Sequence, residues 1–225
     1  AKPTADRDGL FSFCELETFF HELGHLMHFI LYAGEFAGQN SFDTPIDFVE
    51  LPSQMFEQWL QNPKILSMIG KHYQTGESLP QDLIEKIIAN KKFLIGYGFQ
   101  RQVYLALIAL KSFSDKKSKL IDVAKELAPL VVMANHDKQN FNFVYSFMHL
   151  CGGYGARYYS YMWSLAYALD IFDYIKERDG LLNDEIGEEL KNKVLAKGAS
   201  ADYTRIIESF TKRPLSLDSL KKYIN

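Results

Sequence analysis

Apolar residues along this chain recur at the spacing of helices rather than of strands. The clearest segment is Leu16–Tyr32, which is rich in Leu, Phe, Met and His, contains no proline and has Gly24 as its only glycine. Such a segment predicts a long buried helix. A loop over Gly34–Thr44 separates it from a second helical pattern at Asp47–Leu60, in which Pro52 is tolerated near the first turn.

The rest of the chain continues the helical pattern, with polar or glycine-rich breaks between segments. Alternation of β-branched residues is scarce, which predicts little or no sheet. We therefore expect a mainly α fold in which residues 1–225 form one domain, since no repeat, low-complexity tract or linker divides them. The further predicted helices are Pro63–His72, Gln81–Asn90, Phe99–Phe113, Lys119–Leu127, Ala156–Lys176, Asp184–Lys197 and Ala201–Phe210, with breaks at Thr75–Pro80 and Asp137–Asn142.

Composition argues against several classes of protein. The 225 residues are 47% hydrophobic, which is enough for one well-filled core, and the net charge of -3 gives no basic excess for nucleic acid. The most apolar run, Phe93–Leu110, is interrupted by glycines and polar residues, and the polar start has no secretory signal, so we expect no membrane association. Two cysteines, Cys14 and Cys151, cannot form a disulfide framework, which favours a reducing compartment.

The segment FFHELGHLMH carries the pattern His-Glu-x-x-His inside the first apolar helix. His21 and His25 lie one helical turn apart on the same face, so both imidazoles can reach one ion. Glu22 lies about 100° around the helix from His21 and can approach a water molecule on the metal without occupying a coordination position. Zinc lowers the pKa of such a water to about 7, and the glutamate accepts its proton. The pattern predicts one zinc ion per chain, with Glu22 as the catalytic base.

A chance match on a buried helix is the alternative, but three uncompensated polar residues there would be unfavourable, and coordination offsets that cost. His28 is a rival ligand, yet it lies two turns from His21, roughly 10 Å along the axis, so we expect a packed or hydrogen-bonded core histidine.

A third ligand must come from elsewhere, since catalytic zinc commonly has three protein ligands. Glu50, which interrupts an apolar run on the second helix, is the candidate, and a solvent-facing glutamate is its alternative.

The residues HELGH followed by DFVELPSQMFEQW resemble the catalytic domain of the thimet oligopeptidase family of zinc metallopeptidases, which includes neurolysin, oligopeptidase A and dipeptidyl carboxypeptidase. The usual family motif is HEFGH, followed by F-V-E-x-P-S-Q, and Leu23 stands here in place of the usual Phe. The separation of His21 and Glu50 matches the family's spacing. The segments KPTADRDGL and HYQTGESLP also resemble family segments, so the resemblance covers nearly the whole chain.

A second block, HLCGGYGARYYSYMWSLAYALDIF, resembles the family's H-x-x-G-G-Y-x-A-x-Y-Y-x-Y segment. By that match, His149 and Tyr161 would stabilise the tetrahedral oxyanion, while Tyr154 and Tyr158 would contact the substrate. The residues themselves agree, because the three glycines form a loop able to close on a peptide, and Tyr158 and Tyr161 are spaced to face one side of a helix. An aromatic core is the alternative for this stripe, and we expect it for Tyr159, Trp163 and Tyr167.

Two nearby residues carry further expectations. Glu17, one turn before His21, is a candidate to accept a hydrogen bond from a ligand imidazole, with a surface glutamate as the alternative. Cys151 is expected to be a small filler of the glycine-rich loop rather than a thiol on which activity depends.

The resemblance implies a helix-rich zincin with two lobes around a deep channel, which admits short peptides and excludes folded proteins. Family members run to several hundred residues, so it also implies a C-terminal catalytic fragment that lacks an N-terminal lobe and is prone to self-association. We expect zinc-dependent hydrolysis of short peptides. The alternatives are a dipeptidyl carboxypeptidase of the same family and a non-catalytic zinc-binding remnant that binds peptides or a partner. Cytoplasm is the compartment expected, with the mitochondrion as the alternative.

Overall fold

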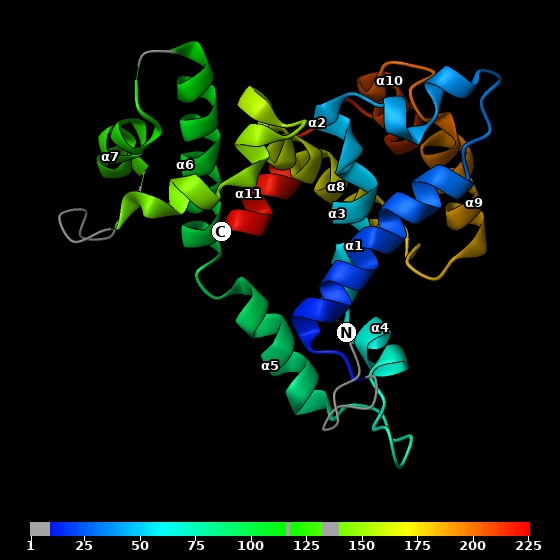
Figure 1. Ribbon diagram of the computed structural model, residues 1–225. Coiled ribbons are helices and arrows are strands. Elements are labelled where there is room, and N and C mark those ends of the chain that lie inside the picture. Colours follow the sequence, from blue (N-terminus) through cyan, green and yellow to red (C-terminus); the bar gives the residue numbers. More distant parts are fainter. Residues whose placement is uncertain (1–9, 116–117, 132–139) are drawn as a thin grey trace.

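A computed structural model describes residues 10–115, 118–131 and 140–225, and it is built from helices (Figure 1). The only bridge between extended residues in these ranges is the isolated antiparallel pair Lys71 and Ser78. The prediction of a mainly α fold with little or no sheet is therefore confirmed.

The α-helices are α1 Phe13–Ile30, α2 Ile46–Val49, α3 Leu51–Glu57, α4 Pro63–Ile69, α5 Gln81–Lys92, α6 Ile95–Ser114, α7 Leu120–Val131, α8 Ser160–Glu177, α9 Asp184–Lys193, α10 Tyr203–Thr211 and α11 Asp218–Ile224. The 3-10 helices are η1 Ala37–Gln39, η2 Ser41–Asp43, η3 Gln58–Gln61, η5 Phe141–Ser146, η6 Met148–Cys151, η7 Gly155–Arg157 and η8 Leu195–Lys197.

Helix α1 begins at Phe13 rather than at the predicted Leu16 because a capping box precedes it. The hydroxyl of Ser12 accepts a hydrogen bond from the backbone N–H of Glu15 at 3.3 Å, and the Glu15 carboxylate accepts one from the N–H of Ser12 at 2.8 Å. This reciprocal pair satisfies two of the N–H groups that a helix start leaves unpaired. Of the segment KPTADRDGL, all but Leu10 lies outside the described residues, as does the first half of the predicted break at Asp137–Asn142.

The second predicted helix, Asp47–Leu60, is divided at Glu50 into α2, α3 and η3. Pro52 explains the division, because it has no N–H for the carbonyl of Phe48 and its ring crowds that carbonyl. Glu50 adopts φ -88° and ψ 0° between the two helices. The break leaves Glu50 at a corner, where its side chain is buried beside α1 rather than exposed on a continuous helix.

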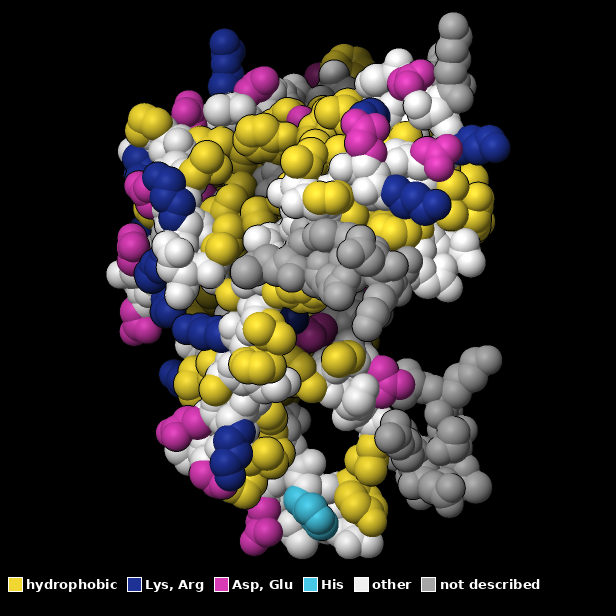
Figure 2. All heavy atoms as spheres, turned by 90° about the vertical axis from the view of Figure 1, so that its left-hand side faces the viewer, with side chains coloured by type: hydrophobic (Ala, Val, Ile, Leu, Met, Phe, Trp, Pro, Cys, Tyr) yellow, Lys and Arg dark blue, Asp and Glu magenta, His cyan; other side chains and the backbone are white. Residues whose placement is uncertain are grey.

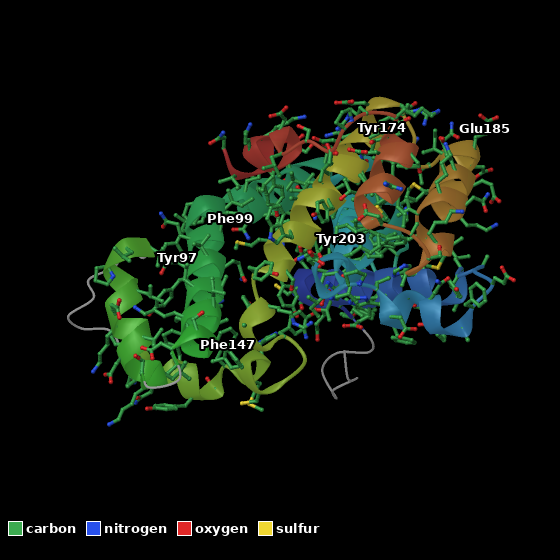
Figure 3. All side chains as sticks on the ribbon, turned by 90° about the horizontal axis from the view of Figure 1, so that it is seen from above. Tyr97, Phe99, Phe147, Tyr174, Glu185 and Tyr203 are labelled. Atoms are coloured by element: carbon green, nitrogen blue, oxygen red, sulfur yellow. The ribbon has the colours of Figure 1, made fainter. Side chains whose placement is uncertain are left out.

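Helix α8 is the central helix of the fold. It packs against α2, α3, α10 and α11, and α3 lies between α8 and α1 (Figure 1). Tyr203 of α10, labelled in Figure 3, donates a hydrogen bond to Asp47 of α2 at 2.8 Å and so ties the C-terminal helices to this layer. The main hydrophobic cluster includes Phe48, Leu51 and Met55 from α2 and α3, Ile171 and Ile175 from α8, and Phe210 from α10. This core sets the position of α3 against α1.

Helices α6 and α7 form a pair beside this layer, and η7 joins the pair to the start of α8. The hydroxyl of Tyr104 on α6 donates to the carbonyl of Ala124 on α7 at 2.7 Å. Helix α6 begins at Ile95 rather than at the predicted Phe99, directly after Leu94, whose φ of 55° lies in the left-handed region. The chain therefore turns between α5 and α6, which run in different directions (Figure 1).

By length and composition, the stretch Gln81–Ser114, which holds α5 and α6, is long and apolar enough to cross a membrane, which the sequence analysis did not expect. Core helices of soluble proteins have the same length and composition. The turn at Leu94 also divides the stretch into two helices.

The prediction that the first helix is buried is wrong for one of its faces. Only Gly24 and His28 of α1 are buried, whereas Phe19 and Leu26 are 51% and 52% exposed. One face packs on α3, whereas apolar side chains on the opposite face, Phe19 and Leu26 among them, meet solvent. Figure 2 looks onto the side formed by α5, α6 and α7, where hydrophobic side chains also lie on the surface.

The aromatic stripe of α8 is divided between core and surface. Tyr167 belongs to the main cluster, as predicted, and Tyr159 is partly buried against a smaller one. Trp163 is 45% exposed, so its assignment to the core is wrong. The terminal helix α11, which the sequence analysis missed, packs on α8 and covers another part of its surface.

Arg213 forms the partner of a fully buried carboxylate. Its guanidinium donates to both oxygens of Asp170 at 3.0 and 2.7 Å, and Asp170 is 0% exposed. We predict that Arg213→Ala lowers the free energy of unfolding by about 3–5 kcal/mol, because it leaves a buried charge without its counter-ion. Urea denaturation measures the loss. In the matched control, Lys222→Ala, the loss should stay below about 1 kcal/mol, because the Lys222 side chain that pairs with Asp173 is exposed. Equal losses in the two variants would contradict the prediction.

Candidate functional site

A close crossing of α1 over α3 brings the two halves of the site together. Gly24 lies at the crossing, and a Cβ atom there would stand 2.5 Å from the carbonyl oxygen of Pro52 and 2.6 Å from the Cα of Ser53. Both neighbours are backbone atoms, so any larger residue would push the helices apart. Glycine at this position therefore lets His21 and His25 reach the start of α3.

Three side chains predicted as metal ligands meet at this crossing. The Nε2 atoms of His21 and His25 lie 3.3 and 3.2 Å from Oε2 of Glu50. One donor atom from each residue falls within 4.8 Å of the others, and the two imidazole rings are 4.9 Å apart. Two imidazoles and one carboxylate are a donor set of catalytic zinc sites, in which the fourth position is open. The residues therefore fit a zinc ion.

His28 lies apart from this cluster. It is 2% exposed, and its ring packs edge-on against Phe48 with centroids 6.1 Å apart. Burial, helped by the nearby His25, lowers the pKa of His28 to about 4, which makes it a neutral core residue. The packed-histidine interpretation of His28 agrees with this placement.

Glu57 is a residue that the sequence analysis missed. Its Oε1 lies 2.7 Å from Nδ1 of His21 and accepts the Nδ1–H, which turns Nε2 toward the ligand cluster. Glu17, the carboxylate suggested for this role, forms an ion pair with Lys91 instead. The sequence did contain a signal for Glu57, because this residue follows Glu50 by about two helical turns and so lies near the same helix face.

The charges of the site favour an ionised Glu50 and a protonated His21. Burial works against the charged form of His21, but hydrogen bonds to Glu50 and Glu57 outweigh it and raise its pKa to about 10. Burial alone would raise the pKa of Glu50. Hydrogen bonds from the two histidines, Tyr154 and Ser53 hold the pKa of Glu50 well below its ordinary range. The carboxylate is thus a permanent negative charge facing the two imidazoles.

An aromatic cluster lies beside Glu50 and is formed by His149 of η6, Tyr154 of the glycine-rich loop (residues 151–155), Tyr158 just before α8 and Tyr161 in its first turn. The rings of Tyr154 and Tyr161 stack with centroids 4.7 Å apart at 18°. His149 lies edge-on to the rings of Tyr154, Tyr158 and Tyr161, at 5.6, 5.1 and 5.8 Å. The hydroxyl of Tyr154 donates a hydrogen bond to Oε1 of Glu50. The four residues predicted for the oxyanion and the substrate therefore form one group, and one of them touches the ligand cluster.

The tyrosines differ in where their hydroxyls point. The ring of Tyr158 is buried, and its hydroxyl donates to Oε1 of Gln102 on α6 at 3.0 Å, a contact that the sequence did not suggest. Burial raises the pKa of Tyr161 to about 12, so its phenol stays neutral and able to donate a hydrogen bond. Tyr158 thus anchors the cluster to α6, while Tyr154 faces Glu50.

Two further predicted positions lie at the surface. Glu22, on α1 next to His21, is exposed, and so is Cys151 in the glycine-rich loop. The expectation that Cys151 is a small filler without a special role stays a prediction. The catalytic and substrate-binding roles of all these residues remain predictions.

Comparison with known proteins places this geometry in context. The model of the family described as Peptidase family M3 matches residues 1–225. Oligopeptidase A of Escherichia coli (strain K12) is 32% identical over 99% of this chain and 33% of its own length. Thimet-like oligopeptidase of Dictyostelium discoideum is 36% identical over 93% of this chain and 32% of its own length. Dipeptidyl carboxypeptidase of Salmonella typhimurium is 28% identical over 99% of this chain and 33% of its own length. The chain thus spans about a third of the length of these relatives.

Replacement of Gly24 tests the helix crossing. We predict that Gly24→Ala lowers the free energy of unfolding by about 1–3 kcal/mol, as overpacking does, and weakens Zn²⁺ binding because it separates the histidines from Glu50. Calorimetric titration and urea denaturation measure the two effects. The matched control is Gly187→Ala on α9, where a Cβ meets nothing within 4 Å, and which should stabilise the helix by about 1 kcal/mol. If the two variants behave alike, Gly24 is not needed for close contact.

Proposed function

Because this chain belongs to peptidase family M3, we propose that it forms the zinc-dependent catalytic part of a peptidase that hydrolyses short peptides. The observation that supports the proposal most directly is the convergence of His21, His25 and Glu50 on one point. The relatives' names, oligopeptidase and dipeptidyl carboxypeptidase, apply to proteins about three times as long. The activity and substrate class are therefore proposed for this chain by analogy, and the donor set supplies the physical support.

In the proposed mechanism, His21, His25 and Glu50 hold the ion, and Glu57 orients His21 through its Nδ1. Bound zinc supplies a Lewis acid that polarises a water molecule and the peptide carbonyl. Glu22 accepts the proton of the attacking water and delivers it to the amine that leaves. Its position next to His21, exposed on α1, gives it access to solvent beside the ligands.

The negative charge that develops on the carbonyl oxygen needs hydrogen-bond donors. We assign this role to Tyr161 and His149, whose rings lie 5.8 Å apart near Glu50. A neutral phenol suits the role, because it donates a hydrogen bond without bringing a charge that must be desolvated. The raised pKa of Tyr161 supports the neutral form at any pH where the enzyme would work.

A dipeptidyl carboxypeptidase is the second candidate, since a relative of that name matches 99% of the chain. The two activities differ in whether the substrate must have a free C-terminus. Cleavage of matched peptides with a free and an amidated C-terminus separates them. An oligopeptidase cleaves both, whereas a dipeptidyl carboxypeptidase requires the free carboxylate.

The metal ligands are tested by binding. We predict one Zn²⁺ per chain and a large loss of affinity in Glu50→Ala, because one of three protein ligands is removed. His28→Leu is the matched control and should keep its zinc affinity, since the neutral His28 ring packs in the core. Metal content after dialysis and competition with a chelator measure both. Zinc binding that survives Glu50→Ala and disappears in His28→Leu would show that the ligand set is wrong.

The base is tested by separating metal binding from turnover. We predict that Glu22→Gln keeps its zinc and loses nearly all peptide hydrolysis, because an amide cannot accept the proton of the attacking water. The assay follows a quenched fluorescent peptide with metal content measured on the same sample. Glu15→Gln, on the same helix and away from the ligands, is the activity control. A metal-loaded Glu22→Gln enzyme with normal turnover would disprove the mechanism.

The exposed face of α1 leads to a prediction about the chain alone. We expect residues 1–225 to bind zinc but to hydrolyse peptides weakly or not at all, because the exposed face of α1 offers a substrate little to orient it. Orientation of the substrate can lower the activation barrier by on the order of 7–11 kcal/mol in favourable cases. The exposed apolar residues of α1 should also favour self-association, which light scattering detects. Addition of the separately expressed N-terminal part of a full-length family member should raise the activity. Full activity of the chain by itself would refute the expectation.

A further inference from the structure

The two oxygens of the Glu50 carboxylate face different parts of the molecule. Oε2 lies 3.3 and 3.2 Å from the Nε2 atoms of His21 and His25, and it accepts a hydrogen bond from Ser53 at 2.9 Å. Oε1 accepts the hydroxyl of Tyr154, which lies 104 residues further along the chain. One oxygen therefore belongs to the metal ligands and the other to the glycine-rich loop.

The hydroxyl of Tyr154 is aimed at Glu50 by the packing of its ring. One face of the ring stacks on Tyr161 in the first turn of α8, and His149 lies edge-on to it. The phenol is therefore a fixed hydrogen-bond donor, whose natural acceptor is an ionised carboxylate.

We propose that Tyr154 is a positioning residue for the ligand Glu50. Its hydroxyl holds Oε1, leaves Oε2 to the metal ion, and so couples the glycine-rich loop to metal binding. The inference rests on the proposed function, because it takes His21, His25 and Glu50 as the zinc ligands. It also gives Tyr154 a role different from the substrate contact that the family resemblance implies.

The loop and the metal site are coupled because each oxygen of the buried Glu50 carboxylate needs a partner. With Oε1 held, Glu50 offers one oxygen to the ion, and coordination positions remain open for water and substrate. Without the phenol, Oε1 loses its partner and is free to turn toward the ion as a second ligand atom. Energetic coupling is reciprocal. If the hydrogen bond raises the affinity for zinc by some factor, bound zinc stabilises the hydrogen bond by the same factor.

Tyr158 provides a matched control within the same cluster. It has the same side chain and also packs against His149 and Tyr161, but its hydroxyl donates to Gln102 on α6. Removal of the Tyr158 hydroxyl takes a partner from Gln102. Only removal of the Tyr154 hydroxyl takes a partner from Glu50.

Zinc affinity of the full chain is the first measurement, by competition with a chromophoric chelator. We expect Tyr154→Phe to bind Zn²⁺ about 10–100-fold more weakly than the unchanged chain, the usual effect of losing a partner of a metal ligand. Tyr158→Phe should show no comparable loss. Circular dichroism of the metal-free variants verifies that both are folded.

The outcomes separate this inference from the function on which it rests. If the unchanged chain binds no zinc, the proposed function fails and the inference fails with it. If the chain binds zinc and Tyr154→Phe binds it equally well, only the inference is overturned. A Tyr154→Phe enzyme with a higher KM and unchanged zinc affinity would return Tyr154 to a substrate contact.

The spectrum of the Co²⁺-loaded chain tests the role of Tyr154 directly, because a purely structural role would leave this spectrum unchanged. Visible absorption of Co²⁺ weakens as its coordination number rises, because geometry governs these bands. We expect weaker absorption per bound ion in Tyr154→Phe, as Oε1 joins Oε2 on the metal, and an unchanged spectrum in Tyr158→Phe. Identical spectra for all three proteins would overturn the claim that Tyr154 selects the oxygen.

Cys151 reports on the loop itself. Its thiol is exposed and lies in the same loop as Tyr154, and Cys14→Ser removes the other exposed thiol. In that background we expect Zn²⁺ to slow the alkylation of Cys151, because the metal strengthens the docking of the loop on Glu50. The effect should disappear on addition of Tyr154→Phe and persist with Tyr158→Phe. Protection that survives Tyr154→Phe would show that the loop and the metal are not coupled through this hydroxyl.

Discussion

The buried carboxylate of Glu50 is the charge on which the site depends. It is 5% exposed, and an ionised group so far from water is tolerated only with partners on all sides. Those partners come from separate parts of the chain, with two histidines on α1, Ser53 on α3 and Tyr154 in the glycine-rich loop. Each segment gains by staying close to the same carboxylate, so the charge that prepares a cation site also holds the local fold together.

Two residues without functional side chains make this arrangement possible. Pro52 breaks the second helix and leaves Glu50 at a corner, and Gly24 lets α1 approach the backbone of α3 directly. The buried face of α1 is covered by α3, which itself rests on α8 and the main core. The other face of α1 remains exposed beside the ligands. A longer family member has additional chain with which to cover such a face, since this chain spans about a third of the relatives' length.

Sequence alone determined what depends on helical periodicity and on chemistry. The spacing of His21 and His25 places two imidazoles on one face of any helix, whatever surrounds it. Scarce strand patterns predicted the mainly α fold, and apolar spacing with proline and glycine breaks predicted the order of the helices from α1 to α10, except that α2 and α3 were expected as one helix. Glu50 stood out because an acidic residue interrupts an apolar run. The capping pair Ser12 and Glu15 would have given the start of α1 from sequence too.

Tertiary structure decided everything that depends on which surfaces meet. Two carboxylates were available near His21, and the crossing of α1 with α3 selected Glu57, while Glu17 turned to Lys91. Tyr154 and Tyr158 carry the same hydroxyl, yet one reaches Glu50 and the other reaches α6. Such choices depend on crossing distances and loop paths between residues far apart in sequence, and local periodicity contains no information about them. The sequence therefore determined which chemical groups are present and their spacing along each helix, and the packing of helices determined which of those groups touch.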